Sequence, residues 1–281
     1  MQAHADQQRM EGRTLVLVPT MGSLHAGHLS LVRRAKAEAD HVTVSIFVNP
    51  TQFGPNEDFE AYPRNFQRDC ELLEEVGGVS TIFAPDEAAL YPEGADQQRA
   101  WVTCPEMSRQ LCGKYRPGHF EGVLTVVMKL FAACKPHIGV FGLKDIQQYI
   151  LLKQMIRDLA LDIKVIGGEI IRESNGLAYS SRNEYLTADE RSQASVISKA
   201  INSATRMIED GVENPMAVIG LIQEMIHSVP QAKLQYAEIV TASKLEPVGQ
   251  FTPGLQVIVA VAVYFRHIRL IDNAFALVPV Q

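Results

Sequence analysis

The sequence lacks any long hydrophobic run. None of its 281 residues falls in an uninterrupted apolar segment of the length that spans a bilayer, about eighteen residues or more. The most apolar stretch, Gly254–Phe265, is too short for this and is typical of a buried strand. The N-terminal segment MQAHADQQRMEGR has no apolar core, so we expect neither a secretory signal nor a membrane partner.

Cysteine and positive charge are also scarce. The four cysteines contain no CxxC pair, and their spacing predicts neither a zinc knuckle nor a disulfide framework. We therefore expect reduced thiols and a cytoplasmic protein. The net charge of −6 argues against a general nucleic-acid-binding protein, which needs a basic surface. It leaves room for a small anionic substrate in a locally basic pocket.

The first part of the chain alternates between β-rich runs and helical patterns. This alternation is typical of parallel βαβ units, so we predict an α/β fold with a Rossmann-like, doubly wound parallel sheet and helices on both faces. The predicted strands are Thr14–Thr20, His41–Val48, Ser80–Pro85, His137–Leu143 and Asp162–Ile171, and the predicted helices are His28–Ala39, Phe66–Val76, Phe120–Cys134 and Ile146–Ala160.

The pattern changes after about Arg172. Thr187 and Glu190 fit a Thr-x-x-Glu capping box, which predicts the start of a helix that runs to Gly211. Asn214, followed by a proline, predicts the start of a second helix.

Two β-rich runs follow these helices, Lys233–Val240 and Gly254–Phe265. Helices followed by strands indicate a separate, smaller α+β domain. We therefore expect two domains, residues 1–171 and residues 172–281.

Four polar segments follow predicted strands. Ligands of an open parallel sheet bind beyond the carboxyl ends of its strands, so we expect these segments to gather along one rim. They are Pro19–His28, Phe47–Arg64, Phe141–Gln148 and Asn175–Leu186.

Two histidines, His25 and His28, flank Gly27 where a strand ends and a helix begins. Both can face one side of the first helical turn, whose free N–H groups and partial positive charge favour phosphate. Gly27 would let a flat ring approach the backbone. These features predict a nucleoside triphosphate site, and the alternative is a pair of surface or capping histidines.

Other kinds of site are not indicated by this segment. A metal site would need a third ligand, which is absent, and neither GxxxxGK(S/T) nor GxGxxG occurs in the required place.

The other polar segments offer further candidates. Lys144 lies at a strand-to-helix junction, where it can neutralise phosphate; alternatively, Asp145 caps the helix beside a solvated lysine. Gln148, on the first helical turn, can point to the same rim. Gln52 follows an Asn-Pro-Thr turn, where its amide can bind a hydroxyl or carboxylate or simply be solvated.

Ser180, Ser181 and Arg182 offer two hydroxyls and a guanidinium. Groups of this kind bind phosphate or carboxylate, and the alternative is a polar linker.

The quoted segments resemble a known family. PTMGSLHAGH resembles the HIGH-type signature of nucleotidylyltransferases and class I aminoacyl-tRNA synthetases. The segments FVNPTQFGPNEDFEAYPR, RPGHFEGVLTVVMKLF, FGLKDIQQ, GLAYSSRNEYL and RLIDN, in this order, resemble the pantothenate synthetases, or pantoate–β-alanine ligases. The resemblance runs from about Thr14 to Asn273.

The resemblance implies an ATP-dependent ligase that works in two steps. The carboxylate of pantoate attacks the α-phosphate of ATP, giving pantoyl adenylate and pyrophosphate, and the amine of β-alanine then displaces AMP to give pantothenate. The first domain would bind ATP and pantoate, and the second would close over them. Mg²⁺ is expected to accompany ATP, and a homodimer is expected from the family.

The resemblance also implies residue roles. His28, His25, Lys144 and Arg182 would be catalytic, Gln52 and Gln148 would bind pantoate or β-alanine, and Asp69 is a candidate metal ligand whose alternative is a solvated helix residue. The residues implied to bind ATP are Met21, Gly22, Ser23, Leu24, His25, Ala26, Gly27, His28, Gly142, Leu143, Lys144, Asp145, Ile171, Tyr179, Ser180, Ser181 and Arg182.

The sequence departs from the family at three places. Leu143 and Cys112 stand where the family usually has acidic residues, and only thirteen residues precede Thr14, where the family usually has a further strand and helix. We expect these departures to change details of the pocket and not the reaction.

Two other functions fit parts of the sequence. A nucleotidylyltransferase on the same fold would transfer AMP to a phosphate and stop there, but Gln52 and its segment favour carboxylate and amine chemistry. A nucleotide-binding regulatory protein would not need both histidines, Lys144 and Arg182. An aminoacyl-tRNA synthetase is disfavoured because the chain is short and acidic and has no basic anticodon-binding domain.

Overall fold

The computed structural model describes residues 1–55 and 57–280. Asn56, in the segment Phe47–Arg64, and Gln281, at the end of the predicted second domain, lie outside these residues. The chain divides into two compact units. Unit 1 contains Met1–Arg109, Gly113–Leu143 and Leu151–Glu169, and unit 2 contains Gln110–Cys112, Lys144–Ile150 and the chain from Ile170 onward.

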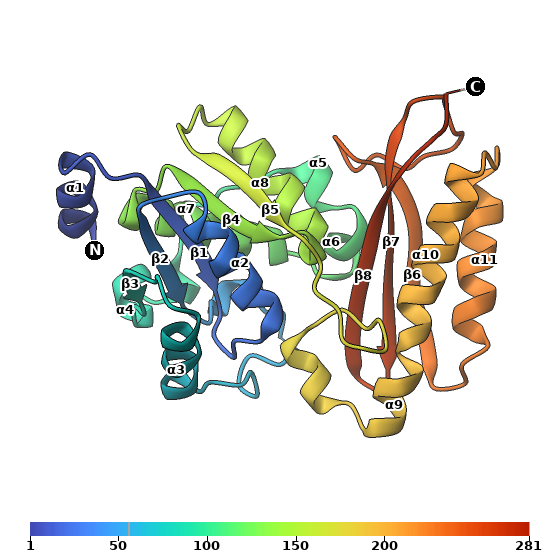
Figure 1. Ribbon diagram of the computed structural model, residues 1–281, viewed down its shortest axis with the longest axis horizontal. Coiled ribbons are helices and arrows are strands. Elements are labelled where there is room, and N and C mark those ends of the chain that lie inside the picture. The colour runs from blue at the N-terminus through green and yellow to red at the C-terminus, as the bar shows by residue number, and fades with distance from the viewer. Residues whose placement is uncertain (56, 281) are drawn as a thin grey trace. The chain divides into compact units, whose positions relative to one another are not determined.

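Unit 1 is built on a five-stranded parallel sheet in the order β3-β2-β1-β4-β5 (Figure 1). From the centre of the sheet, the chain therefore runs outward through β1, β2 and β3 on one side and through β4 and β5 on the other. This is the doubly wound arrangement. This confirms the predicted α/β fold class. The strands are β1 (Leu15–Thr20), β2 (His41–Ile46), β3 (Thr81–Phe83), β4 (Ile138–Gly142) and β5 (Lys164–Gly168).

One face of this sheet packs against α2 (Ala26–Lys36) and α3 (Phe66–Val76). Because side chains alternate along a strand, Val16 and Val18 of β1 join Val140 of β4 in the same buried cluster as Leu31 of α2. Close approach of α2 depends on a glycine, since a Cβ at Gly168 would lie 2.1 Å from Cδ2 of Leu31.

The other face packs against α7 (His119–Cys134). Phe131 of α7 meets Phe141 of β4 edge to face, with ring centroids 6.3 Å apart. A Cβ at Gly139 would lie 2.8 Å from Cε2 of Phe141, so this glycine leaves room for the ring that meets Phe131. Helix α8 (Ile146–Asp158) leads from β4 to β5.

A helix that the sequence did not predict, α1 (Gln2–Met10), precedes β1. It is held to the end of α7 by polar contacts: Lys135 pairs with Asp6 at 2.6 Å, and Arg9 donates to the Lys135 carbonyl at 2.8 Å. Only Ala5 and Gln8 of α1 are buried. With so little apolar surface, α1 leaves no hydrophobic periodicity in the sequence.

Unit 2 contains an antiparallel sheet in the order β6-β7-β8. Its strands are β6 (Ala232–Thr241), β7 (Gln256–Phe265) and β8 (Ile268–Leu277). The prediction of a strand in β6 and β7 is confirmed, whereas β8 was not predicted. The alternation of apolar residues in β8 is interrupted by the buried polar pair Asp272 and Asn273.

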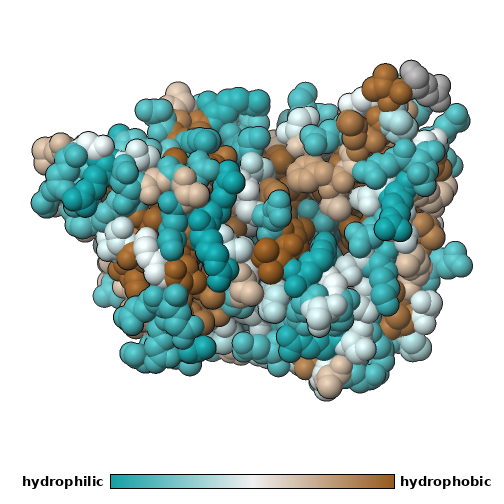
Figure 2. Space-filling model, viewed as in Figure 1, coloured by the Kyte–Doolittle hydropathy of each residue, from teal (hydrophilic) through white to brown (hydrophobic). Residues whose placement is uncertain are grey.

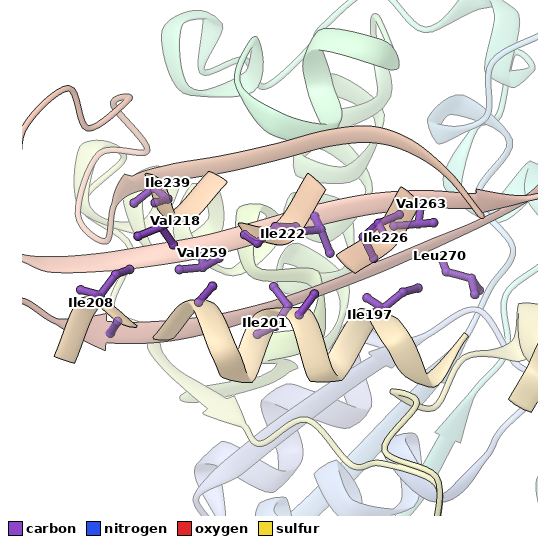
Figure 3. Close-up of a cluster of buried hydrophobic side chains, with 14 of the residues drawn as sticks. Ile197, Ile201, Ile208, Val218, Ile222, Ile226, Ile239, Val259, Val263 and Leu270 are labelled. Carbon is purple, nitrogen blue, oxygen red and sulfur yellow. The ribbon is translucent and has the colours of Figure 1, made fainter. Parts of the chain in front are cut away.

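Two helices, α10 (Ser195–Glu209) and α11 (Pro215–His227), cover one side of this sheet with branched aliphatic side chains. In Figure 3, Ile197 and Ile201 of α10 point toward the strands of the sheet, and Val259 of β7 and Ile222 of α11 lie in the same cluster. All four side chains are at most 1% exposed. Burial of this kind stabilises by about 1.5–3 kcal/mol for each large aliphatic side chain.

The predicted capping box is confirmed, but the helix it opens is shorter than expected. The Thr187 hydroxyl accepts from Glu190 N, and the Glu190 carboxylate accepts from Thr187 N. The helix α9 (Ala188–Gln193) then ends, and α10 follows after Ala194. At this point Ile197 N donates to Ala194 O, a tighter i to i+3 contact that interrupts the α-helical ladder.

The remaining elements are short. They are α4 (Glu87–Leu90), α5 (Pro105–Ser108), α6 (Leu111–Tyr115) and the 3-10 helices η1 (Pro50–Gln52), η2 (Ala95–Gln97), η3 (Leu143–Asp145) and η4 (Ser181–Tyr185).

Hydrophilic residues line the outward faces of α2 and α10 (Figure 2), as expected for helices with one face in a core. No helix among the described residues has the length and apolar character needed to cross a membrane.

Candidate active site

The segment after β1 is held in shape by a buried carboxylate. Asp69 of α3, only 2% exposed, accepts from Ser23 N at 3.0 Å and from Leu24 N at 2.7 Å. Burial raises the pKa of Asp69, while these two N–H groups oppose that shift. Gly22, at φ +77°, makes room for the carboxylate, because a Cβ there would lie 2.9 Å from Asp69 Oδ2.

The expectation that Asp69 is a solvated helix residue is therefore wrong. Both carboxylate oxygens are used by the backbone of the segment that leads to the two histidines. Among residues 1–55 and 57–280, no group of three or more His, Cys, Asp or Glu side chains is arranged to hold a metal ion.

His25 and His28 cap α2 together. Nδ1 of His25 accepts from Gly27 N at 3.2 Å, and Nδ1 of His28 accepts from His25 N at 3.4 Å, so the pair forms a reciprocal capping box. Their ring centroids are 4.0 Å apart. Because each Nδ1 accepts, the ring proton of each neutral imidazole lies on Nε2, which makes Nε2 a donor. Both histidines are therefore capping residues, and the capping hydrogen bonds also fix the tautomer that an anionic ligand would meet.

Gln52 lies at the end of η1, the 3-10 helix that follows β2. Both the nitrogen and the oxygen of its side-chain amide contact neighbouring residues. Its Nε2 contacts the sulfur of Met21 at 3.0 Å, and its Oε1 accepts from Asn49 Nδ2 at 3.1 Å. Asn49, 1% exposed, also donates to Gly122 O in α7 and accepts from the Tyr91 hydroxyl at 2.7 Å. The structure therefore brings Gln52 to the start of the segment that carries the two histidines.

The carbonyl of Gln52 is fixed from the other direction by the start of α7. His119 Nδ1 donates to it at 2.7 Å, and Arg116 donates to it at 3.4 Å. Arg116 also makes a two-pronged contact with Glu57, at 2.6 Å for each oxygen. Burial would raise the pKa of Glu57, but the hydrogen bonds and charge of Arg116 hold it below its ordinary value.

Gly142 ends β4, next to β1, where the winding of the sheet changes direction. Open α/β sheets bind ligands at this switch point, beyond the strand ends. Leu143 follows Gly142 and packs over Gly167, at which a Cβ would lie 2.6 Å from Leu143 Cδ2.

In unit 2, two adjacent residues of β8 hold two of the predicted segments. Asn273 Nδ2 donates to Lys144 O at 2.9 Å, and Asp272 pairs with Arg172 through both oxygens, at 2.7 and 3.0 Å. Lys144 Nζ lies 3.9 Å from Asp145. Lys144 and Arg172 are thereby anchored to the same strand.

Gln148 lies on the first turn of α8 and is partly exposed. Its neighbour Gln147 is buried and donates to Gln110 O at 2.7 Å, so the two adjacent amides have different environments.

The serine-rich segment forms the 3-10 helix η4. Ser180 caps it by accepting from Arg182 N at 3.3 Å, and Tyr179 N donates to Ile171 O at 2.9 Å. The buried Asn183 donates to Glu173 at 2.7 Å.

Glu173 in turn receives two hydrogen bonds from Arg191, at 2.7 and 2.8 Å. Burial would raise the pKa of Glu173, but Arg191 and Asn183 hold it below its ordinary value. This network makes the segment an ordered element and not a loose linker.

Sequence reasoning missed the residues that hold the site. The quoted segments NPTQF, SSRN and RLIDN contain several of them, but their resemblance to the family gave no role. The missed residues are Asn49, Glu57, Arg116, His119, Glu173, Asn183, Asp272 and Asn273.

A family comparison covers nearly all of these elements. The statistical model of the family described as pantoate-beta-alanine ligase matches residues 1–275. The chain belongs to the pantoate-beta-alanine ligase family. This confirms the resemblance drawn from the sequence.

Individual relatives agree with this assignment. The pantothenate synthetase of Salinibacter ruber is 52% identical over 99% of this chain and 96% of its own, and that of Thermotoga neapolitana is 46% identical over 97% and 95%. Among solved structures, the enzyme from Thermus thermophilus matches with a TM-score of 0.88 at 39% identity, covering 96% of both chains.

A further solved structure is the pantoate-beta-alanine ligase of Francisella tularensis in complex with beta-gamma ATP and beta-alanine. It matches with a TM-score of 0.75 at 35% identity, over 96% of this chain and 93% of that one.

Proposed function

We propose that the chain catalyses the ATP-dependent condensation of pantoate and β-alanine to pantothenate, with release of AMP and pyrophosphate. The observation that carries the proposal is the contact between Gln52 Nε2 and Met21. It joins an amide suited to bind a hydroxyl or carboxylate to the segment that presents two imidazoles at a helix N-terminus. Membership in the family and the ATP and β-alanine in the Francisella tularensis complex support the same reaction.

In the first step, a carboxylate oxygen of pantoate forms a bond to the α-phosphorus of ATP, and the bond to the pyrophosphate oxygen breaks. Negative charge spreads over the phosphate oxygens, so the step needs positioning and donors that are already aimed, not a protein nucleophile. His25 and His28 can donate through Nε2, and the N-terminus of α2 adds a partial positive charge. Lys144 and Arg182 are the proposed cationic partners of the phosphates.

In the second step, the neutral amine of β-alanine attacks the acyl carbon of pantoyl adenylate. The C–N bond forms, AMP leaves with the bonding electron pair, and the amine loses a proton. A mixed anhydride of this kind is hydrolysed easily, so it must be shielded from water. We propose that unit 1 supplies the ATP and pantoate contacts and that unit 2 acts as the closing domain.

The remaining ATP contacts are proposed for the backbone and small side chains of four segments: Met21–His28, Gly142–Asp145, Ile171 and Tyr179–Arg182. Gln148 is proposed to bind pantoate with Gln52.

Mg²⁺ is proposed to accompany ATP. Both oxygens of Asp69 already accept backbone N–H groups, so the donors present do not form a cage. A magnesium ion held mainly by phosphate oxygens and water fits this donor set better. A homodimer and a cytoplasmic location also stand as proposals, the first of which light scattering of the purified chain would test.

The decisive experiment is isotope exchange of pyrophosphate into ATP. We expect exchange that depends on pantoate, followed by release of AMP and formation of pantothenate when β-alanine is added. Exchange without a β-alanine-dependent product would favour a nucleotidylyltransferase, and no exchange would favour a nucleotide-binding protein without turnover.

Gln52→Ala provides the matching variant. We expect it to raise the KM for pantoate by roughly tenfold to 150-fold, since a hydrogen bond to a charged group contributes about 1.5–3 kcal/mol, with less change in the KM for ATP. Gln67→Ala, on the exposed face of α3, is the control and should leave both values unchanged. Equal KM values in Gln52→Ala and the parent protein would remove Gln52 from pantoate binding.

A further inference from the structure

Three ligand-type atoms meet at the N-terminal edge of the parallel sheet in unit 1. Nε2 of His4 lies 3.4 Å from Nε2 of His41, and Oγ1 of Thr81 lies 3.2 Å from the first and 3.0 Å from the second. His41 opens β2, Thr81 opens β3, and His4 belongs to α1. In a parallel sheet this edge is opposite the strand ends that carry Gln52 and the two capping histidines.

Hydrogen bonding can satisfy all three atoms, but only along two edges of the triangle. A neutral imidazole Nε2 either carries a hydrogen or offers a lone pair, and the threonine hydroxyl carries one hydrogen. Only two of the three edges can therefore hold a hydrogen at any one time. A cation that accepts a lone pair from each atom would use all three.

The separations fit a single cation. A triangle with sides of 3.4, 3.2 and 3.0 Å has a circumscribed radius of about 1.9 Å, so one point can lie about 2.0–2.1 Å from all three atoms, which is the usual Zn–N distance.

The ring positions give a second, independent check. Two imidazoles that bind one metal ion through Nε2 near the tetrahedral angle place their ring centroids about 5.2 Å apart, whereas a straight N–H···N bond at this spacing would place them about 5.7 Å apart. The ring centroids of His4 and His41 are 5.2 Å apart and the planes are inclined at 55°.

We propose that His4, His41 and Thr81 bind a divalent transition-metal ion of the zinc class. Imidazole nitrogens suit Zn²⁺, Cu²⁺ and Ni²⁺, and water would complete the coordination of a site with two histidines and one hydroxyl. Bound metal would fasten α1 to β2 and β3, and so it would stabilise the folded chain in proportion to its occupancy.

The charges around the cluster do not by themselves favour a cation. The charged groups that act on His41 from nearby are Glu11 and Arg13. These two side chains pair with each other at 2.9 Å, and Arg13 also donates to Gln8 Oε1 at 2.7 Å. Arg13 lowers the pKa of His41 more than Glu11 raises it, so cation binding must come from the three ligand atoms and not from the surrounding charge.

The test is a calorimetric titration of the whole chain with Zn²⁺ in the absence of nucleotide. His4 is exposed on a terminal helix, so His4→Ala should fold, and His227→Ala, at the end of α11, is the matched control. We expect His4→Ala to bind one equivalent fewer than the parent protein and than His227→Ala. Binding elsewhere, for example at His25 and His28, would be the same in all three proteins.

Two further measurements do not depend on that variant alone. Zn²⁺ should slow amide hydrogen exchange across Gln2–Met10 in the parent protein and not in His4→Ala. Thr81→Val, which keeps the β-branched shape but removes the hydroxyl, should bind Zn²⁺ more weakly than the parent. Equal Zn²⁺ binding by His4→Ala and the parent, or no binding by the parent in stoichiometric excess of metal, would overturn the proposal.

Discussion

At the scale of single residues, His28 has two roles, and an informative substitution must remove one of them and keep the other. Its Nδ1 closes the capping box of α2, and its Nε2 is the proposed donor to phosphate. An ordinary alanine variant removes both roles at once. Glutamine at this third helical position can still accept from the N-cap N–H, because Gln is a natural member of the capping box.

We therefore expect His28→Ala and His28→Gln to differ in stability but not in activity. Both should lower pantoate-dependent pyrophosphate exchange by roughly 100- to 1000-fold, the usual effect of removing one aimed donor. His28→Ala should also lower the free energy of unfolding by about 1 kcal/mol, whereas His28→Gln should stay close to the parent protein. Exchange assays and urea denaturation measure the two effects separately, and full exchange in His28→Gln would show that the imidazole is not needed.

The sequence singled out candidate residues for the chemistry, but it did not indicate which residues hold them in place. His25, His28, Gln52 and Lys144 became candidates because polar groups after buried strands have few structural uses, and their roles stay predictions. The supporting role of Asp69 was not found, since its partners Ser23 and Leu24 are distant in sequence and contribute only backbone N–H groups. Backbone donors leave no pattern in a single sequence.

At the scale of elements, the contact between α7 and η1 depends on a glycine. A Cβ at Gly122 would lie 2.3 Å from Thr51 O and 2.8 Å from Gln52 N. Both atoms are backbone, so they cannot move without displacing the Gln52 side chain. A helix interior is an unfavourable place for glycine, by about 0.5–1 kcal/mol relative to alanine, and here the close approach of η1 accounts for it.

Gly122→Ala should therefore impair the site by displacing the Gln52 side chain, although it removes no group that takes part in the reaction. We expect a loss of about 1–3 kcal/mol in the free energy of unfolding and a rise in the KM for pantoate that exceeds the rise in the KM for ATP. Gly220→Ala in α11 is the control, because a Cβ there meets nothing within 4 Å, and it should stabilise the chain by about 0.5–1 kcal/mol. Unchanged KM values in a folded Gly122→Ala protein would contradict this account of Gln52.

Elements with strong hydrophobic periodicity were predicted, and those held by polar contacts were not. The bounds of α3 match the prediction residue for residue, and β1, β2, β4 and α7 differ by a few residues at most. Helix α1 and strand β8 were missed. The first has almost no apolar face, and the second carries the buried Asp272, whose partner Arg172 is a hundred positions away.

At the scale of the whole molecule, each unit has a hydrophobic core of its own among the described residues. Strand alternation predicted that two folding patterns follow one another in the sequence. It did not predict that Gln110–Cys112 and Lys144–Ile150 belong with the later unit. Segments this short do not show in their sequence which unit they join; for Lys144 the structure shows one such contact, the hydrogen bond from Asn273 to its carbonyl.

The proposed function requires residues of both units to act on the same ATP. His28 belongs to unit 1 and Arg182 to unit 2, so a double-mutant cycle tests this requirement. We expect His28→Gln and Arg182→Ala each to lower kcat/KM for ATP in the exchange reaction. If both stabilise one transition state, the double variant should lose less than the product of the two single losses, because groups that act as a unit are not additive.

Arg206→Ala provides the reference cycle. Arg206 is exposed on α10, so Arg206→Ala should change kcat/KM for ATP little. When it is combined with His28→Gln, the loss in the double variant should equal the product of the two single losses. A deviation from the product by a factor of ten corresponds to a coupling of about 1.4 kcal/mol, which is well above the error of additivity for distant sites. If His28→Gln and Arg182→Ala multiply as cleanly as the reference pair, then the two residues do not act as one unit. An unchanged kcat/KM for ATP in Arg182→Ala would remove Arg182 from the ATP site and leave the assignment of His28 standing.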